Sequence, residues 1–328
     1  NLVQGNFIGT DVTGAVAVGN SIGIDFNGAT TTSNTIGGTV AGARNIVSGN
    51  SLYGVYMFAG PSANVVQGNY IGTDVNGTAA VANGVGVKIE AASNNTVGGG
   101  SAAARNVISG NTSQGVRITD TCVNNAVIGN YIGTDVSGVV GLGNAGDGIS
   151  IDTGAAASLV GGASAADSNL IAFNGGNGIT VGAFPTDVAD GNSILSNSIH
   201  SNTGLGIDIA ADAAVTANDA GDVDTLGGNK RQNFPVLALA VVSGTTGGIF
   251  VKGTLDSAAA HIQLFIAAED ASGSGEGKTL VYDQTGVSPG NFGIGTPSPL
   301  SAVSAGNKLT ATATSLGTGL LLFVPLDD

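Results

Sequence analysis

Residues 64–74 read NVVQGNYIGTD, and nearly the same wording appears at residues 1–11 (NLVQGNFIGTD) and 125–135 (NAVIGNYIGTD). Copies of a second kind alternate with these: NTIGGTVAGARNIVSGN at 34–50, NTVGGGSAAARNVISGN at 95–111 and SLVGGASAADSNLIAFN at 158–174. A seventh, shorter copy, NSILSNSIHSN, occupies residues 192–202. Self-similarity at a period of 30 to 34 residues predicts a repeat architecture in which each copy is one structural unit.

The apolar residues of each copy lie at alternate positions, which is the period of a β-strand and not of an α-helix. An Ile or Val stands two residues after the first Asn of nearly every copy, another two residues after the second Asn, and a third follows a Gly. One coil of three short strands has an apolar edge on each strand and cannot bury these edges alone. Neighbouring coils must therefore stack and share a narrow core.

The second Asn of every copy forms an unbroken column, and we expect its side chains to hydrogen-bond from coil to coil at one corner. The column comprises Asn6, Asn45, Asn69, Asn106, Asn130, Asn169 and Asn197. Five residues further on, a third polar column is predicted, in which aspartates of the odd copies alternate with asparagines. Its members are Asp11, Asn50, Asp74, Asn111, Asp135, Asn174 and Asn202.

Odd copies carry extra residues after Gly-Thr-Asp and even copies carry them before the second Asn, so alternate coils should bulge at two different corners. This pattern resembles the right-handed parallel β-helix repeat of pectin-lyase-like proteins. The IGTD and GG…ARNVISGN segments resemble repeats of large secreted or surface β-helix polypeptides of bacteria. The resemblance implies an all-β fold, with a right-handed parallel β-helix of about seven coils over residues 1–225.

The repeat ends after the seventh copy. Residues 219–233 are polar and Gly-rich, and 226–233 are predicted to be a linker. Alternating apolar runs such as AHIQLFIAAED and GIFVKGTLDS then fill residues 234–328, separated by turns such as SGTTGG and SGSGEG. This arrangement predicts an immunoglobulin-like antiparallel β-sandwich as a second domain.

Composition excludes several classes of protein. The 328 residues include 56 Gly, 42% are hydrophobic and only 10% are charged, which argues against a disordered chain. The net charge of −14 argues against nucleic-acid binding. The single Cys122 excludes a disulfide framework within the chain, and no apolar run is long enough to span a membrane. Low Lys content and few redox-sensitive residues favour an extracellular or cell-surface location.

The candidates for catalysis all have a structural alternative. Asp11, Asp74 and Asp135 would lie about 9.6 Å apart, two strand spacings, near the upper limit for the carboxylates of an inverting glycosidase. Their recurrence at a turn of every odd coil favours a corner role instead. Arg44 and Arg105, candidate bases for a lyase, likewise occur in the repeated ARN context. Neither His200 nor His261 has a recognisable triad around it, so no catalytic residue is assigned.

Two outward columns are candidates for binding carbohydrate. Phe7, Tyr70 and Tyr131 recur on every second coil, a spacing that suits stacking on a periodic sugar chain. The alternative, which we favour, is that loops of the even coils or the second domain cover this stripe. Lys88 and Arg117 occupy equivalent positions on adjacent coils and could hold an acidic polymer, although such a column is more often a solvated face.

The candidate metal site is the segment 218–224, where Asp219, Asp222 and Asp224 surround a Gly. Calcium prefers several oxygen ligands from such a tight loop, but the segment lacks the complete twelve-residue EF-hand pattern and its closing Glu. A solvated turn is the alternative. No cofactor is required by the sequence, and calcium is the one ion that it suggests.

The columns that repeat from copy to copy are those that stack the coils, and no irregular polar cluster stands out. This favours a non-catalytic structural or adhesive module of an extracellular surface. A polysaccharide lyase, a glycoside hydrolase or a carbohydrate-binding module that uses a face of the β-helix is the alternative. Asn1 already occupies a repeat column. The expected partners are therefore other copies of the chain or neighbouring domains of a longer one, packed on the first coil, with a polysaccharide as the expected ligand. An exposed fragment end is the alternative to such packing.

Overall fold

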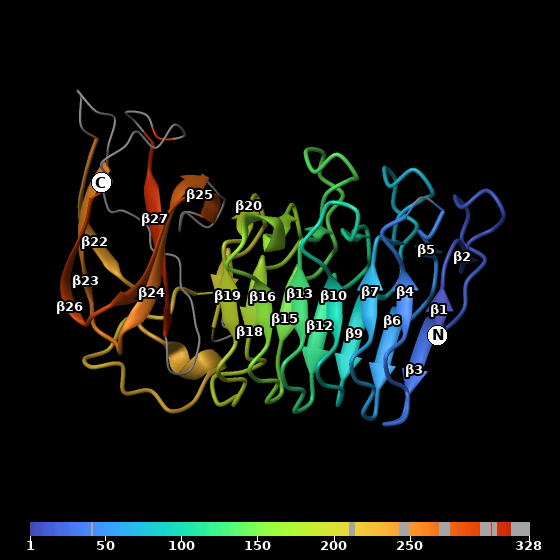
Figure 1. The fold of residues 1–328 in the computed structure, drawn as a ribbon, viewed down its shortest axis with the longest axis horizontal. Helices are drawn as coiled ribbons and strands as arrows, with labels where there is room; N and C mark the ends of the chain where they lie inside the picture. Colours follow the sequence, from blue (N-terminus) through green and yellow to red (C-terminus); the bar gives the residue numbers. More distant parts are fainter. Residues whose placement is uncertain are drawn as a thin grey trace.

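The computed structural model describes residues 1–40, 42–209, 214–242, 249–268, 276–295, 303 and 307–315. The first part of the chain winds into a parallel β-helix of seven coils, and two antiparallel sheets follow at its C-terminal end (Figure 1). The all-β class and the β-helix predicted from the repeats are therefore confirmed. No helix within the described residues is long and apolar enough to cross a membrane.

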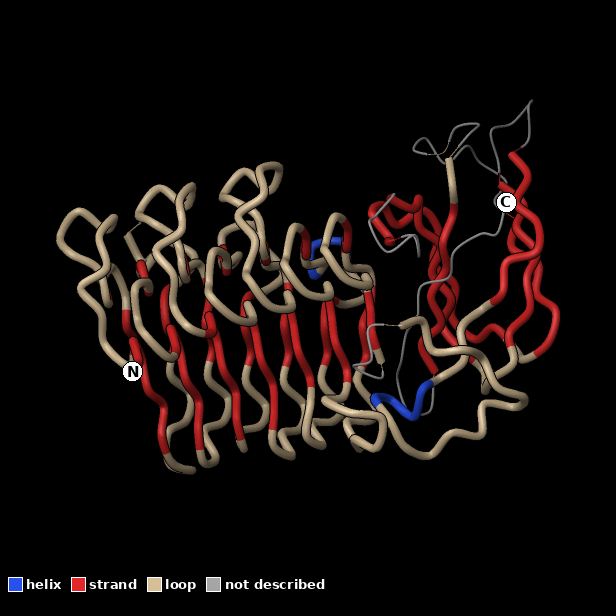
Figure 2. The backbone as a smooth tube through the Cα atoms, turned by 180° about the vertical axis from the view of Figure 1, so that it is seen from behind, coloured by secondary structure: helices blue, strands red, loops and turns tan. Residues whose placement is uncertain are grey.

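Each coil contributes one strand to each of three parallel sheets, and Figure 2 shows strands of successive coils side by side along the β-helix. Sheet 1 consists of β1 (Leu2–Val3), β4 (Thr35–Gly37), β7 (Val65–Gln67), β10 (Thr96–Gly98), β13 (Ala126–Ile128), β16 (Leu159–Gly161) and β19 (Ser193–Leu195). Sheet 2 consists of β2 (Phe7–Ile8), β5 (Ile46–Val47), β8 (Tyr70–Ile71), β11 (Val107–Ile108), β14 (Tyr131–Ile132), β17 (Leu170–Ala172) and β20 (Ser198–His200). Sheet 3 consists of β3 (Ile22–Asn27), β6 (Tyr53–Phe58), β9 (Val85–Glu90), β12 (Val116–Thr119), β15 (Ile149–Ile151), β18 (Ile179–Val181) and β21 (Ile207–Asp208).

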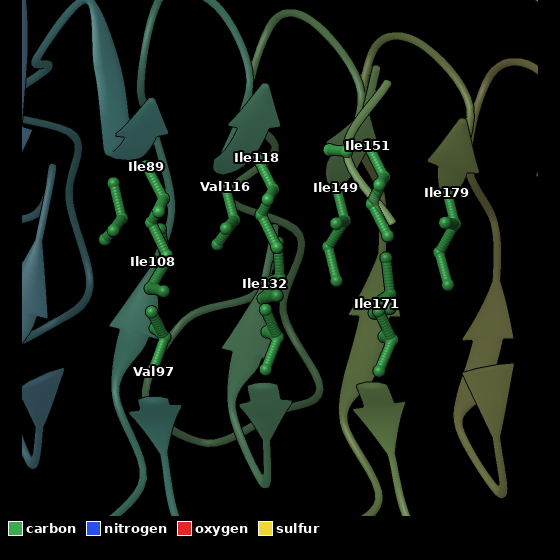
Figure 3. Close-up of a cluster of buried hydrophobic side chains, with 14 of the residues drawn as sticks. Ile89, Val97, Ile108, Val116, Ile118, Ile132, Ile149, Ile151, Ile171 and Ile179 are labelled. Carbon is green, nitrogen blue, oxygen red and sulfur yellow. The ribbon is translucent and has the colours of Figure 1, made fainter. Parts of the chain in front are cut away.

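The β-branched columns fill the space between the three sheets. Ile108, Ile132 and Ile171 follow one another along sheet 2, and Val116 and Ile149 face them from sheet 3 (Figure 3). All five side chains are completely buried. Strand register places equivalent residues of successive copies opposite one another, so every coil covers the apolar edge of the next.

The Gly of each IGTD segment is required by the close approach of neighbouring coils. Gly72 has a φ of +92°, and a Cβ atom there would lie 2.3 Å from the Oδ1 atom of Asn111 and 2.4 Å from the carbonyl oxygen of Ser109. Gly133 has the same environment two coils further on. Only Gly satisfies both the positive φ and this spacing.

The second Asn column is a continuous ladder, as predicted. The amide of Asn69 donates to Asn106 Oδ1 at 3.1 Å, and Asn106 donates to Asn130 Oδ1 at 2.9 Å. The same bond joins all successive members from Asn6 to Asn197. These side chains are buried beyond the first coil, and each also donates to a backbone carbonyl, as Asn106 does to Val66. The ladder thus satisfies polar groups that stacking removes from water.

The predicted third column is wrong in the first, third and fifth coils and right at Asn202 of the seventh. In those three coils the ladder residues are Asn20, Asn83 and Asn144, not Asp11, Asp74 and Asp135. The ladder runs through Asn20, Asn50, Asn83, Asn111, Asn144, Asn174 and Asn202. The odd-coil insertion lies between each Asp and its ladder Asn and projects as a hairpin, three of which stand out in Figure 2. The insertion places the ladder Asn several positions later in the sequence, so counting five residues from the second Asn selects the aspartate instead.

The C-terminal part is built from two sheets. One has the order β22 (Val236–Val242), β23 (Ile249–Leu255), β26 (Gly290–Gly295), and the other β25 (Glu276–Val287), β24 (Ala260–Ala268), β27 (Leu309–Ser315). All of their pairings are antiparallel. Val251 and Ile294 of the first sheet share a buried core with Ile262 and Ala311 of the second, which is the arrangement of a sandwich. Segments 243–248, 269–275 and 316–328 of the predicted sandwich lie outside the described residues.

Residues after the seventh coil cover the end of the β-helix. Phe265 of β24 belongs to the β-helix core and is only 1% exposed. Asn229, in the short 3-10 helix Gly228–Arg231, accepts a hydrogen bond from the amide of Asn192 at 3.2 Å. The first Asn of the copies also forms a ladder, in which Asn34 donates to Asn64 Oδ1 and Asn64 to Asn95 Oδ1. The helix lies inside the predicted linker, and its buried Asn229 adds a member to the end of this ladder.

Candidate functional site

The outer face of sheet 3 carries a group of interacting polar and aromatic side chains. Lys88 and Arg117 are register partners on β9 and β12, as the sequence predicts. Each has an acidic partner, however. Lys88 Nζ lies 2.5 Å from Glu90 Oε2, and Arg117 Nε lies 3.0 Å from Asp152 Oδ2. The two cations are therefore neutralised within the protein.

An aromatic cluster adjoins Lys88. The ring centroids of Tyr53 and Tyr56 are 4.6 Å apart, and those of Tyr56 and Phe58 are 5.5 Å apart. The ammonium of Lys88 lies 5.1 Å from the Tyr53 ring and 5.5 Å from that of Tyr56. All three rings are partly exposed. Tyr56 of β6 is the register partner of Lys88 and belongs to the same outward column. Phe58 lies two residues from Tyr56 and is identified by the two-residue alternation of β6, whereas Tyr53 lies three residues away and is not.

Asp152 is the most heavily hydrogen-bonded carboxylate of this face. It accepts from Arg117, from the hydroxyls of Thr119 at 2.5 Å and Ser150 at 2.7 Å, and from Thr153 at 2.9 Å. Burial alone would raise the pKa of Asp152, but these hydrogen bonds and the charge of Arg117 outweigh it and lower the pKa. Asp152 therefore stays ionised at neutral pH.

Asp147 lies at the opposite end of β15 and behaves differently. Burial raises its pKa, and the charges of Asp208 and Asp152 add to the shift, against hydrogen bonds from Asn177 and Thr180. The backbone N–H of Asn177 donates to Asp147 at 2.8 Å, while its side-chain amide donates to Asp208 at 3.1 Å. Two carboxylates of the same coil are thus held with opposite pKa shifts.

The aromatic stripe on sheet 2 is covered at Tyr70 and partly covered at Tyr131, in agreement with the covering that the sequence favours over sugar stacking. Tyr70 is only 5% exposed and packs with Ile46 and Val107. The guanidinium of Arg44 lies 4.1 Å from the centre of its ring, and Arg105 lies at the same distance over Tyr131. Phe7, on the first coil, is the exposed member of the stripe.

Part of this cover comes from a source that the sequence did not suggest. Arg44 and Arg105 come from even-coil loops, as expected, but the hairpins of the odd coils also fold over the rings. A Cβ atom on Gly77 would lie 2.9 Å from the Tyr70 ring, and one on Gly138 would lie 2.8 Å from that of Tyr131. At the other end, Ser198 donates to the backbone carbonyl of Lys278 in β25.

The aspartates of the Gly-Thr-Asp segments hold the hairpins in shape. The carboxylate of Asp74 accepts from the backbone N–H groups of Thr78 at 2.8 Å and Ala79 at 3.0 Å. Burial raises the pKa of Asp74, and these bonds lower it by more. Asp11 and Asp135 make equivalent bonds to Val16 and Val140. This geometry supports the corner role and uses the carboxylate oxygens that a glycosidase would need.

The predicted calcium ligands do not converge. Within the described ranges, no three His, Cys, Asp or Glu side chains come close enough to hold a metal ion. Asp222 accepts from the backbone N–H of Asn233 at 2.8 Å, and Asp219 accepts from that of Val223 at 3.2 Å. Burial raises the pKa of Asp222, with a further contribution from Asp219 and Asp224. The segment is an internally hydrogen-bonded turn.

The two histidines lie where the β-helix meets the sandwich. His200 packs edge-on against Phe173, with ring centroids 5.9 Å apart, and its Nδ1 lies 3.1 Å from the Ser201 hydroxyl. Burial, with a smaller effect of Lys278, lowers the pKa of His200 to about 4. His261 is paired with Asp283, which also accepts from Gln263. Neither histidine contacts a serine and an aspartate in the order that a triad requires.

No protein-family model matches the sequence, and no curated protein matches it. Two solved structures are similar in fold. The full-length tailspike protein 2 of an Escherichia coli O157:H7 bacteriophage is 11% identical, with a TM-score of 0.40, over 98% of this chain and 50% of that one. The enzymatically active domain of the bacteriophage CBA120 tailspike protein 2 is 10% identical, with a TM-score of 0.27, over 98% and 56%. The chain spans about half the length of these proteins. At such low identity the similarity carries no information on ligand or activity.

Proposed function

We propose that this protein is a non-catalytic structural or adhesive module of an extracellular surface assembly. The observation that carries the proposal is that both carboxylate oxygens of Asp152 are already fully hydrogen-bonded within the protein. Asp152 is 3% exposed and its oxygens are occupied by four side chains, so it has no free lone pair to offer a substrate. A general base or nucleophile needs such an oxygen within reach of the reacting atom. The carboxylates of Asp11, Asp74 and Asp135 are likewise occupied, by backbone N–H groups of the hairpins.

The repetition of the coils supports the same proposal. An enzyme needs one exceptional coil, whereas a scaffold needs equivalent ones. The ladders through Asn106 and Asn111 pass through every coil with the same bond, which gives a rigid rod with outward faces free to vary. On sheet 3 the partly exposed rings of Tyr53, Tyr56 and Phe58 offer an apolar surface to a partner.

A glycoside hydrolase is the second candidate, and one observation favours it. Asp147 has a raised pKa and Asp152 a lowered one, and a pair of carboxyl groups with divergent pKa values is the pattern of a general acid and its ionised partner. Against it, the partners of Asp152 leave it no oxygen for water or sugar.

A screen of purified protein on a glycan array, combined with assays for new reducing ends and unsaturated products, tests the proposal. We expect retention on one or more polysaccharides or cell surfaces without any product. Product formation that is abolished by Asp147→Asn would instead establish the hydrolase. The matched control is Asp167→Asn, a carboxylate in an even-coil loop that caps a short helix through Ser164.

Other copies of this chain, or neighbouring coils of a longer one, are the proposed structural partners. The outer edges of β1, β2 and β3 are unpaired in the described part of the chain, and Leu2 is 68% exposed. The opposite end is covered by the sandwich. Unlike ends favour head-to-tail contacts, which build open filaments or rings.

A further inference from the structure

Within the described part of the β-helix, the two cations that lack an acidic partner lie at a different corner from Lys88 and Arg117. Lys88 and Arg117 are paired, whereas neither Arg44 nor Arg105 has a carboxylate oxygen within 4.0 Å among the described residues. Both project from even-coil loops at the corner between sheets 1 and 2. In a chain with a net charge of −14, two unpaired guanidinium groups on one edge form a local region of positive charge.

The two arginines are held in the same way. The Nε–H of Arg44 donates to the carbonyl oxygen of Gly68, and that of Arg105 to Gly129, both at 3.4 Å. The Cζ atom of each guanidinium lies over a tyrosine ring, 4.1 Å from the ring centre. An arginine has five N–H donors. Nε and one ring face therefore fix the group in place, while its four Nη–H donors have no protein acceptor within the described ranges.

A hollow lies between the two positions. It has a volume of about 380 Å³ and is lined by Thr39 and Arg44 of the first even-coil loop, Gly68 of the coil between, and Ala103 of the next loop. It arises because the third coil has no insertion at this corner, so the loops of the second and fourth coils stand apart. Apart from Arg44, no charged side chain lines it.

The spacing of the arginines defines the ligand. They occupy equivalent places two coils apart, which corresponds to about 9.6 Å at the usual distance between strands. We propose that Arg44 and Arg105 form a two-point binding site for an acidic polysaccharide that carries one carboxylate or sulfate on every second sugar. The uncharged sugar between two acidic ones then occupies the hollow. This inference rests on the adhesive function proposed above and names its ligand class.

A nucleic acid fits the site less well. Duplex DNA carries one charge about every 1.7 Å of its axis, so most phosphates on this face would meet no cation. The net charge of −14 would repel the uncompensated phosphates. A polysaccharide with one charge on every second sugar avoids that cost, because its charges coincide with the two arginines.

Calorimetric titration with hyaluronan oligosaccharides, in which glucuronate alternates with N-acetylglucosamine, tests the proposal. Neutral chitin oligosaccharides of the same length and a single-stranded DNA are the comparison ligands. We expect the parent to bind hyaluronan, more weakly as salt increases, and to bind neither comparison ligand. Arg44→Gln and Arg105→Gln should each weaken binding at least tenfold, because loss of either contact removes the two-point attachment.

Two further variants control for charge and for folding. Lys252→Gln removes a cation from β23 of the sandwich and should leave affinity unchanged. Arg44→Lys keeps the charge but not the fixed planar group, and should give an intermediate loss. Equal thermal midpoints will show that the variants are folded.

The outcomes separate this inference from the proposed function. The two-arginine site is wrong if hyaluronan does not bind, if chitin or DNA binds equally well, or if Lys252→Gln weakens binding as much as Arg44→Gln. Binding of neutral glycans alone would leave an adhesive module without this site. Turnover of a polysaccharide would refute the non-catalytic function and leave the arginine site standing.

Discussion

The side-chain amide of Asn202 donates a hydrogen bond to Glu276 Oε1 at 3.0 Å, so the third asparagine ladder ends on a carboxylate from β25 of the sandwich. The other ladders end in a similar way. Asn192 pairs with Asn229, and Gln263 exchanges two hydrogen bonds with Ser196, the neighbour of the last member of the second ladder. The residues after the seventh coil thus provide the polar groups that an eighth coil would have supplied.

Replacing Glu276 tests this cap. Glu276→Leu removes one of the buried acceptors of the Asn202 amide, which also donates to the Ile171 carbonyl, and should cost on the order of 1–3 kcal/mol in the free energy of unfolding. Glu276→Gln keeps an acceptor oxygen at the same place and should cost less. Denaturant titration of both variants provides the measurement. Equal stability of Glu276→Leu and the parent would show that the ladder needs no cap.

Replacing an internal ladder residue should have a similar effect. Asn106→Leu removes an amide that joins Asn69 to Asn130 and also donates to the Val66 carbonyl. Three neighbouring polar groups lose their partner, and we expect a loss on the order of 1–3 kcal/mol in denaturant titration. Asn27→Leu, at an exposed position of β3, is the matched control and should change little. If the two variants have the same free energy of unfolding, the ladder does not stabilise the fold.

Phe265 closes the apolar core at the same end as Glu276. Its side chain is buried against the β-helix core although it belongs to the sandwich. Phe265→Ala should therefore destabilise the protein by about 3–5 kcal/mol, as expected for loss of a buried aromatic ring. Phe250→Ala removes a ring that is 40% exposed and should cost far less. Thermal unfolding followed by circular dichroism compares the two, and a similar midpoint would argue against a shared core.

Much of the fold could be predicted from the sequence, because stacking forces equivalent residues into register. Ile108 and Asn106 occupy the core and ladder positions that the columns assigned to them. The columns failed at Asp74, where an insertion separates the aspartate from the ladder residue Asn83. A constant offset carries no information about where a loop rejoins the coil.

The candidate sites were harder to predict, because they depend on neighbours that are distant in the sequence. Arg117 looked like a free cation until the fold placed Asp152 of the next coil beside it. Tyr70 looked like an outward ring, but Arg44 and an odd-coil hairpin cover it. A repeat gives the direction of a side chain but not the residues that lie over it.

His200 should make stability depend on pH. Its pKa is lowered from 6.5 to about 4 because the buried ring resists protonation. Below pH 6.5 the unfolded chain binds a proton that the folded chain does not, so this group lowers stability as the pH falls from about 6.5 to 4. The thermal midpoint of His200→Gln should fall less over that range than that of the parent. If the thermal midpoints of the two proteins fall equally with pH, the lowered pKa of His200 is contradicted.

Calcium removal should have no effect on stability. Asp219 and Asp222 are engaged with backbone N–H groups, and the acidic residues of this turn do not converge on one point. We therefore expect the same thermal midpoint with a chelator and with added calcium. A midpoint that rises with calcium concentration would restore the predicted site, since a ligand that binds only the folded state stabilises it.

Assembly through the first coil is the last prediction. The edges of β1 and β2 are unpaired in the described structure, and Leu2 and Phe7 are exposed beside them. An unpaired strand edge readily pairs with another chain, and lysines on the edge prevent this. Light scattering of the parent should show a mass that grows with concentration, whereas a Leu2→Lys, Phe7→Lys double variant should remain monomeric. Val139→Lys, on an exposed odd-coil hairpin away from this edge, adds a charge without blocking pairing and should assemble like the parent. A parent that stays monomeric at high concentration, or a Val139→Lys variant that loses assembly equally, would contradict pairing through this edge.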